Sequence, residues 1–232
     1  MKKNVLIIGG SSGIGRALVD LLIPEHNIYV ASRSNESLAN AEVTHISYDV
    51  MNDSLDVSDL PEQLDGFVYC PGSINLRPFR GLKPQTFQND FNLNVVGAVK
   101  SLQSVLPLLQ KSLQASLVFY STVAVSTGMP FHASVAAAKG ALEGLTRSLA
   151  AEYAPKFRVN CIAPSLTDTP LADKFLNNEA KLEKAQERHP LKQVGTAKNI
   201  AQMTAFLLGE ESQWMTGQIL HVDGGIGDLK TN

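Results

Sequence analysis

The sequence predicts a single α/β domain, in which a doubly wound, seven-stranded parallel sheet carries helices on both faces. Short runs that are apolar on both faces alternate with segments of helical periodicity along the whole chain. This alternation is typical of buried parallel strands covered by helices. A glycine-rich turn also joins the first apolar run to the first helical segment, as in Rossmann sheets that bind nucleotides. Right-handed crossovers then place ligands at the carboxyl ends of the strands.

The expected elements follow one another in regular order. Strands are predicted at residues 5–8, 28–31, 43–47, 67–70, 117–120, 159–163 and 218–222. Helices are predicted at 13–23 and near 84–111, 133–153 and 196–208, and Pro107 is expected to kink the second of these. Residues 165–195 are polar, with helical charge spacing at 171–188. They are interpreted as a substrate flap beside the strand ends, within one domain spanning 1–232.

Composition excludes several classes of protein. With 44 % hydrophobic residues, 18 % charged residues and a net charge of −2, the chain is unlike a disordered one. A pI of about 6.2 argues against binding to a nucleic-acid backbone. No apolar run approaches the roughly 20 residues of a membrane helix. The start, MKKNVLIIGG, is interpreted as a first strand and not as a signal peptide. Neither a nucleic acid nor a membrane is therefore expected as a partner.

The cysteines and histidines predict neither a disulfide nor a metal site. Cys70 and Cys161 lie far apart, each beside an apolar run. We interpret them as buried thiols in a reducing compartment, which indicates a cytoplasmic protein. The five histidines show no spacing typical of metal ligands, so no metal is expected.

The glycine-rich turn after the first strand indicates a phosphate site. It reads Gly9-Gly10-Ser11-Ser12-Gly13-Ile14-Gly15. Gly9 permits a tight turn, Gly13 lets the backbone approach a pyrophosphate, and Gly15 lets the helix pack closely. The helix N-terminus offers free N–H groups to the anion, and the serine hydroxyls can add donors. The alternative is a purely structural turn.

The end of the second strand distinguishes between two cofactors. NAD-binding sheets carry an acidic residue about 20 positions after the glycines, which binds the ribose hydroxyl. This chain instead has Ser32-Arg33-Ser34 there. The guanidinium of Arg33 matches a 2′-phosphate in charge and geometry, so NADP(H) is the predicted cofactor. The alternative is an ordinary exposed arginine.

Further motifs extend over nearly the whole chain. They are Asp49-Val50 after the third strand, Gly72 after the fourth, Asn94 in FNLNVVGAV, Lys139 in AAAKGALEGLTRSLAAE, residues 164–169 after RVNCIAP, and the closing MTGQILHVDGG. With the glycine turn, these motifs resemble those of the short-chain dehydrogenase/reductase family. The resemblance implies hydride transfer between a nicotinamide and a carbonyl or alcohol substrate. It also implies a homodimer or homotetramer paired through the helices near 84–111 and 133–153.

The resemblance assigns roles to single residues. Those expected to touch the cofactor, besides the glycine turn and Arg33, are Asp49, Val50, Gly72, Lys139, Pro164, Leu166 and Thr169. Thr122 stands where the family has a serine that polarises the carbonyl. Asn94 is expected to help hold a water that feeds protons through Lys139.

The sequence departs from the family at the proton donor. The family has a tyrosine four residues before the lysine, whereas this chain has Val135. Valine can neither donate nor accept a proton, and loss of a general acid typically lowers a rate about 10²- to 10⁴-fold. Three further departures are the segment Tyr69-Cys70-Pro71-Gly72, which replaces Asn-Asn-Ala-Gly, Ser165, which replaces a glycine, and Ile8, which replaces a threonine.

Several groups are candidates for the missing donor. His132 lies three residues before Val135 on the same helical face, and imidazoles titrate near neutral pH. The alternative for His132 is a structural or surface role. Ser134 is expected to point to a different face, and Tyr120 is expected to lie in the core. Water or an acidic group of the substrate is a further candidate.

Three functions stay open at this point. The first is an NADP(H)-dependent oxidoreductase with an atypical donor, whose partly apolar pocket includes Met129, Phe131, Leu166 and Phe175. The second is an NADP(H)-binding sensor or scaffold without turnover. The third is elimination or isomerisation with His132 as the base. Because function depends on the site, the fold alone does not choose among them.

Overall fold

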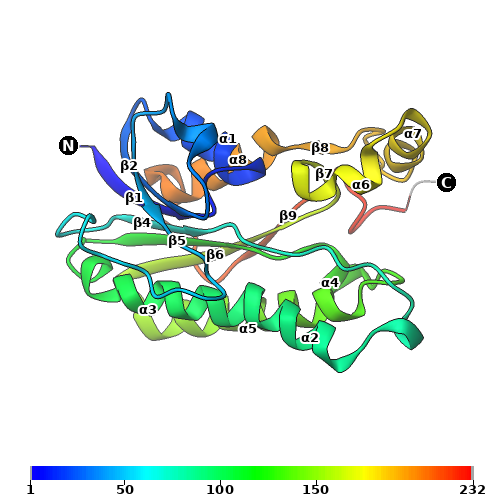
Figure 1. The fold of residues 1–232 in the computed structure, drawn as a ribbon, viewed down its shortest axis with the longest axis horizontal. Helices are drawn as coiled ribbons and strands as arrows, with labels where there is room; N and C mark the ends of the chain where they lie inside the picture. Colours follow the sequence, from blue (N-terminus) through cyan, green and yellow to red (C-terminus); the bar gives the residue numbers. More distant parts are fainter. Residues whose placement is uncertain (1, 231–232) are drawn as a thin grey trace.

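The computed structural model describes residues 2–230 as a three-layer molecule, with a parallel sheet between two layers of helices (Figure 1). The sheet has seven strands in the order β3-β2-β1-β4-β5-β6-β9. They are β1 (Lys3–Ile8), β2 (His26–Ser32), β3 (Val43–Ser47), β4 (Gly66–Tyr69), β5 (Ala115–Tyr120), β6 (Phe157–Pro164) and β9 (Ile219–Val222). All seven predicted strands are confirmed, with ends displaced by at most two residues.

Two groups of helices cover the two faces of the sheet. α1 (Gly13–Leu22) and α8 (Ala197–Leu208) pack together on one face. The other face carries α2 (Pro84–Phe91), α3 (Gly97–Leu109), α4 (Ala124–Thr127) and α5 (Ala133–Tyr153) (Figure 1). Short 3-10 turns occupy Glu36–Leu38, Phe79–Gly81, Pro170–Ala172 and Glu210–Ser212.

The helix predicted near 84–111 is the one element that the structure corrects. A π-helical turn, Asn92–Val96, separates α2 from α3. Such turns widen the backbone by one residue and occur frequently at functional sites. Pro107 lies in the last turn of α3, and the kink expected there stays a prediction.

The core lies on both sides of the sheet, because the central strands are apolar on both faces. Every residue of β4 and β5 is buried. Phe67 and Phe119 meet edge to face on the α3–α5 side, with ring centroids 6.2 Å apart. On the α1–α8 side, Val68 and Val118 belong to a second apolar cluster. This burial fixes the strands firmly, so that the loops at their ends are held in place.

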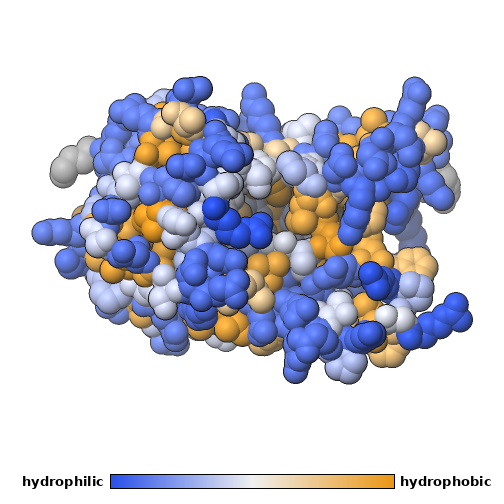
Figure 2. Space-filling view, in the orientation of Figure 1, coloured by the Kyte–Doolittle hydropathy of each residue, from blue (hydrophilic) through white to orange (hydrophobic). Residues whose placement is uncertain are grey.

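The strand order reverses between β1 and β4, and this reversal creates a crevice at the carboxyl ends of the strands. A segment carrying α6 (Asp173–Leu176) and α7 (Glu179–Glu187) lies at this edge (Figure 1). Its base is closed by β7 (Thr167–Asp168), which pairs with β8 (Gly195–Thr196). In the space-filling view, apolar side chains show in the recess between this segment and the helices of the opposite layer (Figure 2).

Within residues 2–230, no helix combines the length and the apolar character that crossing a membrane requires.

Candidate active site

A pocket of about 450 Å³ opens at the carboxyl ends of the strands. The residues singled out from the sequence that line it are Ile14, Cys70, Gly72, Tyr120, Thr122, Met129, His132, Val135, Lys139, Pro164, Ser165, Leu166, Thr169 and Phe175. These residues come from the glycine turn, the ends of three strands, α5 and the α6–α7 segment. The fold therefore brings residues separated by more than a hundred positions to one cavity.

The glycine turn has a geometry that fits a pyrophosphate. Gly9 and Gly13 have φ angles of 79° and 53°, in the left-handed region that favours glycine. A Cβ on Gly15 would collide with the carbonyl oxygen of Gly9, so the helix begins directly against the turn. Ser12 caps α1 without a side-chain hydrogen bond, which leaves its hydroxyl and the first N–H groups of the helix for a ligand. Thr169 lies against this turn, since its Cβ is 3.4 Å from where Gly13 would carry one.

Arg33 and Asp49 lie near each other beyond the ends of β2 and β3. Arg33 is exposed, and its side chain has no hydrogen bond or ion pair within residues 2–230. The pKa of Asp49 is lowered, chiefly by the N–H of Met51 and to a smaller extent by the charge of Arg33. Val50 is buried in the core on the α3–α5 side, so only its backbone is free to touch an adenine. In the glycine turn, the carbonyl oxygen of Ser11 accepts a hydrogen bond from the hydroxyl of Ser37.

α5 places Val135 and Lys139 one helical turn apart, and both line the pocket. The ammonium of Lys139 donates a hydrogen bond of 2.7 Å to the carbonyl oxygen of Tyr120, at the end of β5. Burial lowers the pKa of Lys139 to about 8, and the nearby Asp90 carboxylate opposes part of this shift. Burying the charged ammonium of Lys139 therefore costs desolvation free energy in the folded protein.

Asn94 lies in the π-helical turn, next to the same lysine. Its amide nitrogen donates to the carbonyl oxygen of Asp90 at 2.7 Å and to the hydroxyl of Ser73 at 3.2 Å. Its Oδ1 is buried and has no partner within the described chain. Oδ1 of Asn94 and Nζ of Lys139 each lie 3.4 Å from where Gly72 would carry a Cβ. Glycine at position 72 therefore leaves the amide and the ammonium facing one space.

Asp90 and Ser73 extend this polar network, and sequence reasoning missed both. Asp90 is 1 % exposed, and its Oδ1 accepts hydrogen bonds from Ser73 at 2.6 Å and Asn75 at 2.7 Å. Ser73 lines the pocket, so the network reaches the cavity from the side of α2. In the sequence, the signal that would have indicated this network is an aspartate, Asp90, on the buried face of an amphipathic helix.

Comparisons with known proteins agree with this arrangement. A family model described as enoyl-(acyl carrier protein) reductase matches residues 10–227. The chain belongs to the short-chain dehydrogenase/reductase family. A tropinone reductase homologue from Arabidopsis thaliana is 32 % identical over 245 residues, which cover 96 % of this chain and 91 % of the relative.

Solved structures show the same fold. A short-chain dehydrogenase/reductase (glucose/ribitol dehydrogenase) from Brucella melitensis has a TM-score of 0.88 at 25 % identity, covering 97 % of this chain and 99 % of the other. The structure titled ElxO with NADP bound has a TM-score of 0.88 at 26 % identity, with the same coverage of both chains. The doubly wound sheet expected from the sequence is therefore that of a short-chain dehydrogenase/reductase.

Position 135, where the resemblance led us to expect a tyrosine, carries no group that can transfer a proton. Val135 is 5 % exposed and contributes only methyl groups to the pocket wall. Thr122 lies nearby on the wall, and its Oγ1 accepts a hydrogen bond of 3.3 Å from the N–H of Ala124. A carbonyl beside Lys139 thus meets a hydroxyl from Thr122 but no phenol from α5.

The candidate donors from the sequence occupy different places. His132 caps α5 and lines the pocket, and its Nδ1 lies 2.8 Å from the carbonyl oxygen of Pro130. The hydroxyl of Tyr120 is buried against Thr204 of α8, at 2.7 Å, and Ser134 is fully buried away from the pocket. Phe131 was expected in the apolar wall, and this was wrong. It is 54 % exposed and does not line the pocket, and its φ of 71° lies in the left-handed region just before α5 begins.

Two further pocket residues, Ser165 and His189, form a pair that the sequence did not indicate as catalytic. Oγ of Ser165 lies 2.8 Å from Nε2 of His189, and Nδ1 of His189 lies 2.7 Å from the carbonyl oxygen of Ala185. His189 is 3 % exposed. The two residues are 24 positions apart, so no local motif joins them. The serine at a position where the family has glycine was the only available signal.

The two cysteines are free thiols. Burial raises the pKa of Cys70 and of Cys161 to about 12 in each case. Cys70 lines the pocket, but its thiol is held in the unreactive protonated form.

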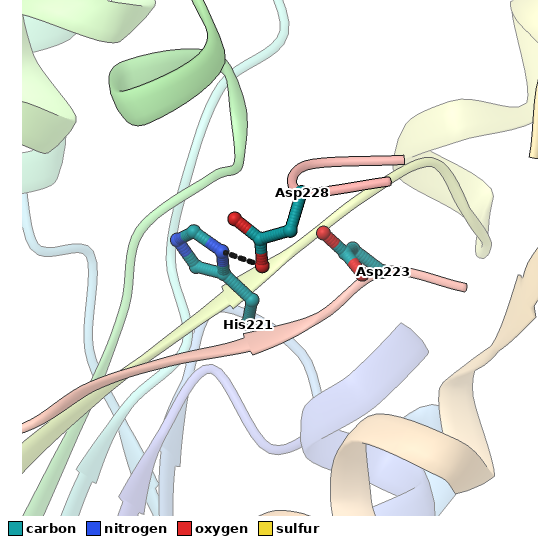
Figure 3. Close-up of side chains that lie close together, drawn as sticks. All are labelled: His221, Asp223 and Asp228. Carbon is teal, nitrogen blue, oxygen red and sulfur yellow. Dashed lines mark hydrogen bonds and ion pairs between the residues drawn. The ribbon is translucent and has the colours of Figure 1, made fainter. Parts of the chain in front are cut away.

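Three potential metal ligands, one in β9 and two in the turn that follows it, lie close together outside the pocket (Figure 3). Nδ1 of His221 is 3.3 Å from a carboxylate oxygen of Asp228, as the close-up shows. Asp223 accepts hydrogen bonds from the N–H groups of Gly225 and Gly227, so its carboxylate already shapes the turn. The cluster is explained by these contacts, which fold the chain back after the last strand.

A measurable consequence of the buried Lys139 is a pH-dependent stability. The native state binds fewer protons than the unfolded state between pH values of about 8 and 10.5, so this lysine lowers stability below that range and the penalty fades as pH rises. We expect the free energy of unfolding of the wild type, relative to Lys139→Met, to increase by about 2–3 kcal/mol between pH about 7 and about 10. Urea unfolding of both proteins without cofactor measures this difference. A difference independent of pH would contradict the lowered pKa.

Proposed function

We propose that this short-chain dehydrogenase/reductase is an NADP(H)-dependent oxidoreductase that interconverts a carbonyl and an alcohol. The observation that carries the proposal is that Thr122 and Lys139 line one pocket together with Ile14 and Thr169, which belong to the glycine turn and the segment against it. A bound nicotinamide cofactor would supply or accept the hydride. The residues of the chain would bind the cofactor, orient the carbonyl group of the substrate and supply or accept the proton.

The residues that would hold the cofactor fit its charges. The free N–H groups at the start of α1 would bind the pyrophosphate, and the guanidinium of Arg33, which has no partner within residues 2–230, would bind the 2′-phosphate. Asp49 contacts the adenine, and Lys139 holds the ribose. Gly72, Pro164, Leu166 and Thr169 flank the nicotinamide. A relative whose structure is titled with NADP bound supports the choice of cofactor.

The pocket lining favours a substrate with an apolar body and an anionic group. Met129, Leu166 and Phe175 supply apolar surface, and the segment between β7 and β8 forms a flap over it. The flap also supplies four cations to the lining, which are Lys174, Lys181, Lys184 and Arg188. Among residues 2–230, no aspartate or glutamate lines this pocket. Carboxylate-bearing ketones and other anionic carbonyl compounds are therefore the substrates to test first.

Self-association through α5 is part of the same proposal. Ala137 and Gly144 lie seven residues apart on an exposed face of α5. A Cβ on Gly144 would meet nothing within 4 Å, so packing within one chain does not account for the small residue. A second copy of the helix fits closely against such a face.

Cofactor binding and turnover test the proposal directly. We expect NADPH fluorescence to change on binding, and Arg33→Ala to lower NADPH affinity about 10- to 100-fold, as loss of a charge-assisted bond predicts, without affecting NADH. Arg147→Ala, which removes an exposed arginine of α5, is the matched control. NADPH should be consumed with at least one member of a panel of ketones, quinones and β-keto thioesters, with and without an anionic group. Binding without any consumption would instead favour the sensor or scaffold, which Val135 allows.

A further inference from the structure

We propose that Ser165 and His189 form a proton relay that replaces the missing tyrosine. The inference rests on the proposed reductase function and concerns the same pocket. Ser165 is the residue that touches the substrate oxygen, and His189 acts through it as the source of the proton. Both residues line the cavity that contains Thr122 and Lys139.

The hydrogen bonds fix the orientation of the imidazole. The carbonyl oxygen of Ala185, 2.7 Å from Nδ1 of His189, can only accept, so Nδ1 carries a hydrogen. In the neutral ring, Nε2 is then an acceptor, and it lies 2.8 Å from Oγ of Ser165. The serine hydroxyl therefore donates to the ring when the ring is neutral. When the ring is protonated, Nε2–H donates to the serine, whose own proton is free to point into the pocket.

Three parts of the fold hold this pair rigidly. Ser165 directly follows β6, and Ala185 lies within α7. The turn after β9 approaches the ring from a third side, since Cδ2 of His189 is 3.5 Å from where Gly224 would carry a Cβ. Gly224 has a φ of 63°, which allows that approach. A ring held in this way keeps the relay ready for the reaction without loss of entropy at that step.

The proton balance of the relay is simple in both directions. Reduction places a hydride on the carbonyl carbon and requires one proton on the oxygen. Ser165 gives its hydroxyl proton to that oxygen and takes the Nε2 proton of the imidazolium, which leaves His189 neutral. After the alcohol leaves, a water in the pocket gives a proton to the hydroxyl of Ser165, which passes its own proton to Nε2, because the ring itself is 3 % exposed. In oxidation, the neutral ring receives the alcohol proton through Ser165.

Hydrogen bonding favours His189 over His132 as the source. Both ring nitrogens of His189 are engaged, Nε2 with Oγ of Ser165 and Nδ1 with the carbonyl oxygen of Ala185 in the last turn of α7. His132, the N-cap residue of α5, lies with Nδ1 2.8 Å from the carbonyl oxygen of Pro130 and has no hydroxyl partner within residues 2–230.

Two variants test the relay. We expect His189→Gln, which keeps a hydrogen-bonding group near Ser165 but cannot carry the proton, to lower kcat about 10²- to 10⁴-fold with KM and NADPH affinity unchanged. Ser165→Ala should lower kcat in the same way, and Ser165→Thr should retain activity because it keeps the hydroxyl. His221→Gln is the matched control, since His221 also lies beside a serine, Ser126, but outside the pocket.

A spectroscopic measurement tests the geometry without any turnover. Imidazole ¹⁵N resonances of the cofactor-free protein should show His189 as the Nδ1–H tautomer. Ser165→Ala should shift the Nε2 resonance and leave that of Nδ1 in place. An Nε2–H tautomer would overturn the relay. An Nε2 chemical shift that is the same in Ser165→Ala as in the wild type would also overturn it.

The outcomes separate this inference from the function on which it rests. If no carbonyl compound in the panel causes the wild type to consume NADPH, the proposed function is wrong, and so is the relay. If the wild type turns over and both Ser165→Ala and His189→Gln turn over equally fast, only the relay is wrong. If His132→Ala loses activity while His189→Gln keeps it, the proton comes from His132, and the relay is again overturned. Should His189→Gln fold poorly by circular dichroism, Ser165→Ala decides the question alone.

Discussion

A tyrosine at position 135 is expected to restore carbonyl reduction to the His189→Gln protein, raising kcat about 10²- to 10⁴-fold. Val135 lines the pocket one helical turn before Lys139, so a phenol placed there would share the cavity with the substrate. The lysine ammonium would favour the phenolate and thereby ease release of the proton. The Val135→Tyr, His189→Gln double variant would then donate its proton from α5, independently of the flap. Steady-state kinetics of NADPH consumption measure the gain.

Phenylalanine at position 135 in the same background is the matched control. It has nearly the same bulk as tyrosine but no hydroxyl, so it reports any effect of filling the pocket. We expect no recovery with Val135→Phe. Equal rates for the two double variants would show that the phenol hydroxyl contributes nothing. The pocket around Val135 would then be built for a smaller residue and a different chemistry.

Gly15→Ala is expected to impair both folding and cofactor binding. Its Cβ would collide with the carbonyl oxygen of Gly9, a backbone atom that moves only if the turn moves. Overpacking of this kind lowers the free energy of unfolding by about 1–3 kcal/mol. The shifted turn should misplace the N–H groups that face the pyrophosphate, and NADPH affinity should fall about 10- to 100-fold. Urea unfolding and NADPH titration measure the two effects.

Gly81→Ala provides the comparison for this variant. A Cβ on Gly81 would meet nothing within 4 Å, and the residue is exposed. We expect its stability and NADPH affinity to match those of the wild type. If Gly15→Ala behaved like Gly81→Ala, the turn would not be the phosphate site.

The strands and long helices could be predicted because each has a local signature. Strands apolar on both faces have no other stable place than the middle of a covered sheet. The helix predicted near 133–153 coincides with α5, and the strand predicted at 43–47 has the bounds of β3. The π-helical turn at Asn92–Val96 could not be predicted, since it follows from a change in backbone hydrogen bonding within a continuous helical pattern. The short β7–β8 pair was also missed, because two residues carry no periodicity.

The site was predictable where a motif is contiguous and not where it is assembled in space. The glycine turn, Lys139 and the valine one turn before it are all readable along the chain. The pairs Ser73–Asp90 and Ser165–His189 each join separate elements, and only the folded chain brings them within hydrogen-bond distance. Phe131 illustrates the opposite error, in which an apolar residue close to the site in the sequence is exposed and does not line the pocket.

The pairing of β7 with β8 has a consequence for how such proteins diversify. The two strands join the start and the end of the α6–α7 segment, so this excursion leaves the domain and returns to it at one place. Its sequence can therefore be exchanged as a cassette between relatives while the seven-stranded sheet stays intact. Lys174, Lys184 and Arg188 all belong to the excursion, so on the proposed function such an exchange would change the charge preference for substrates in a single evolutionary event.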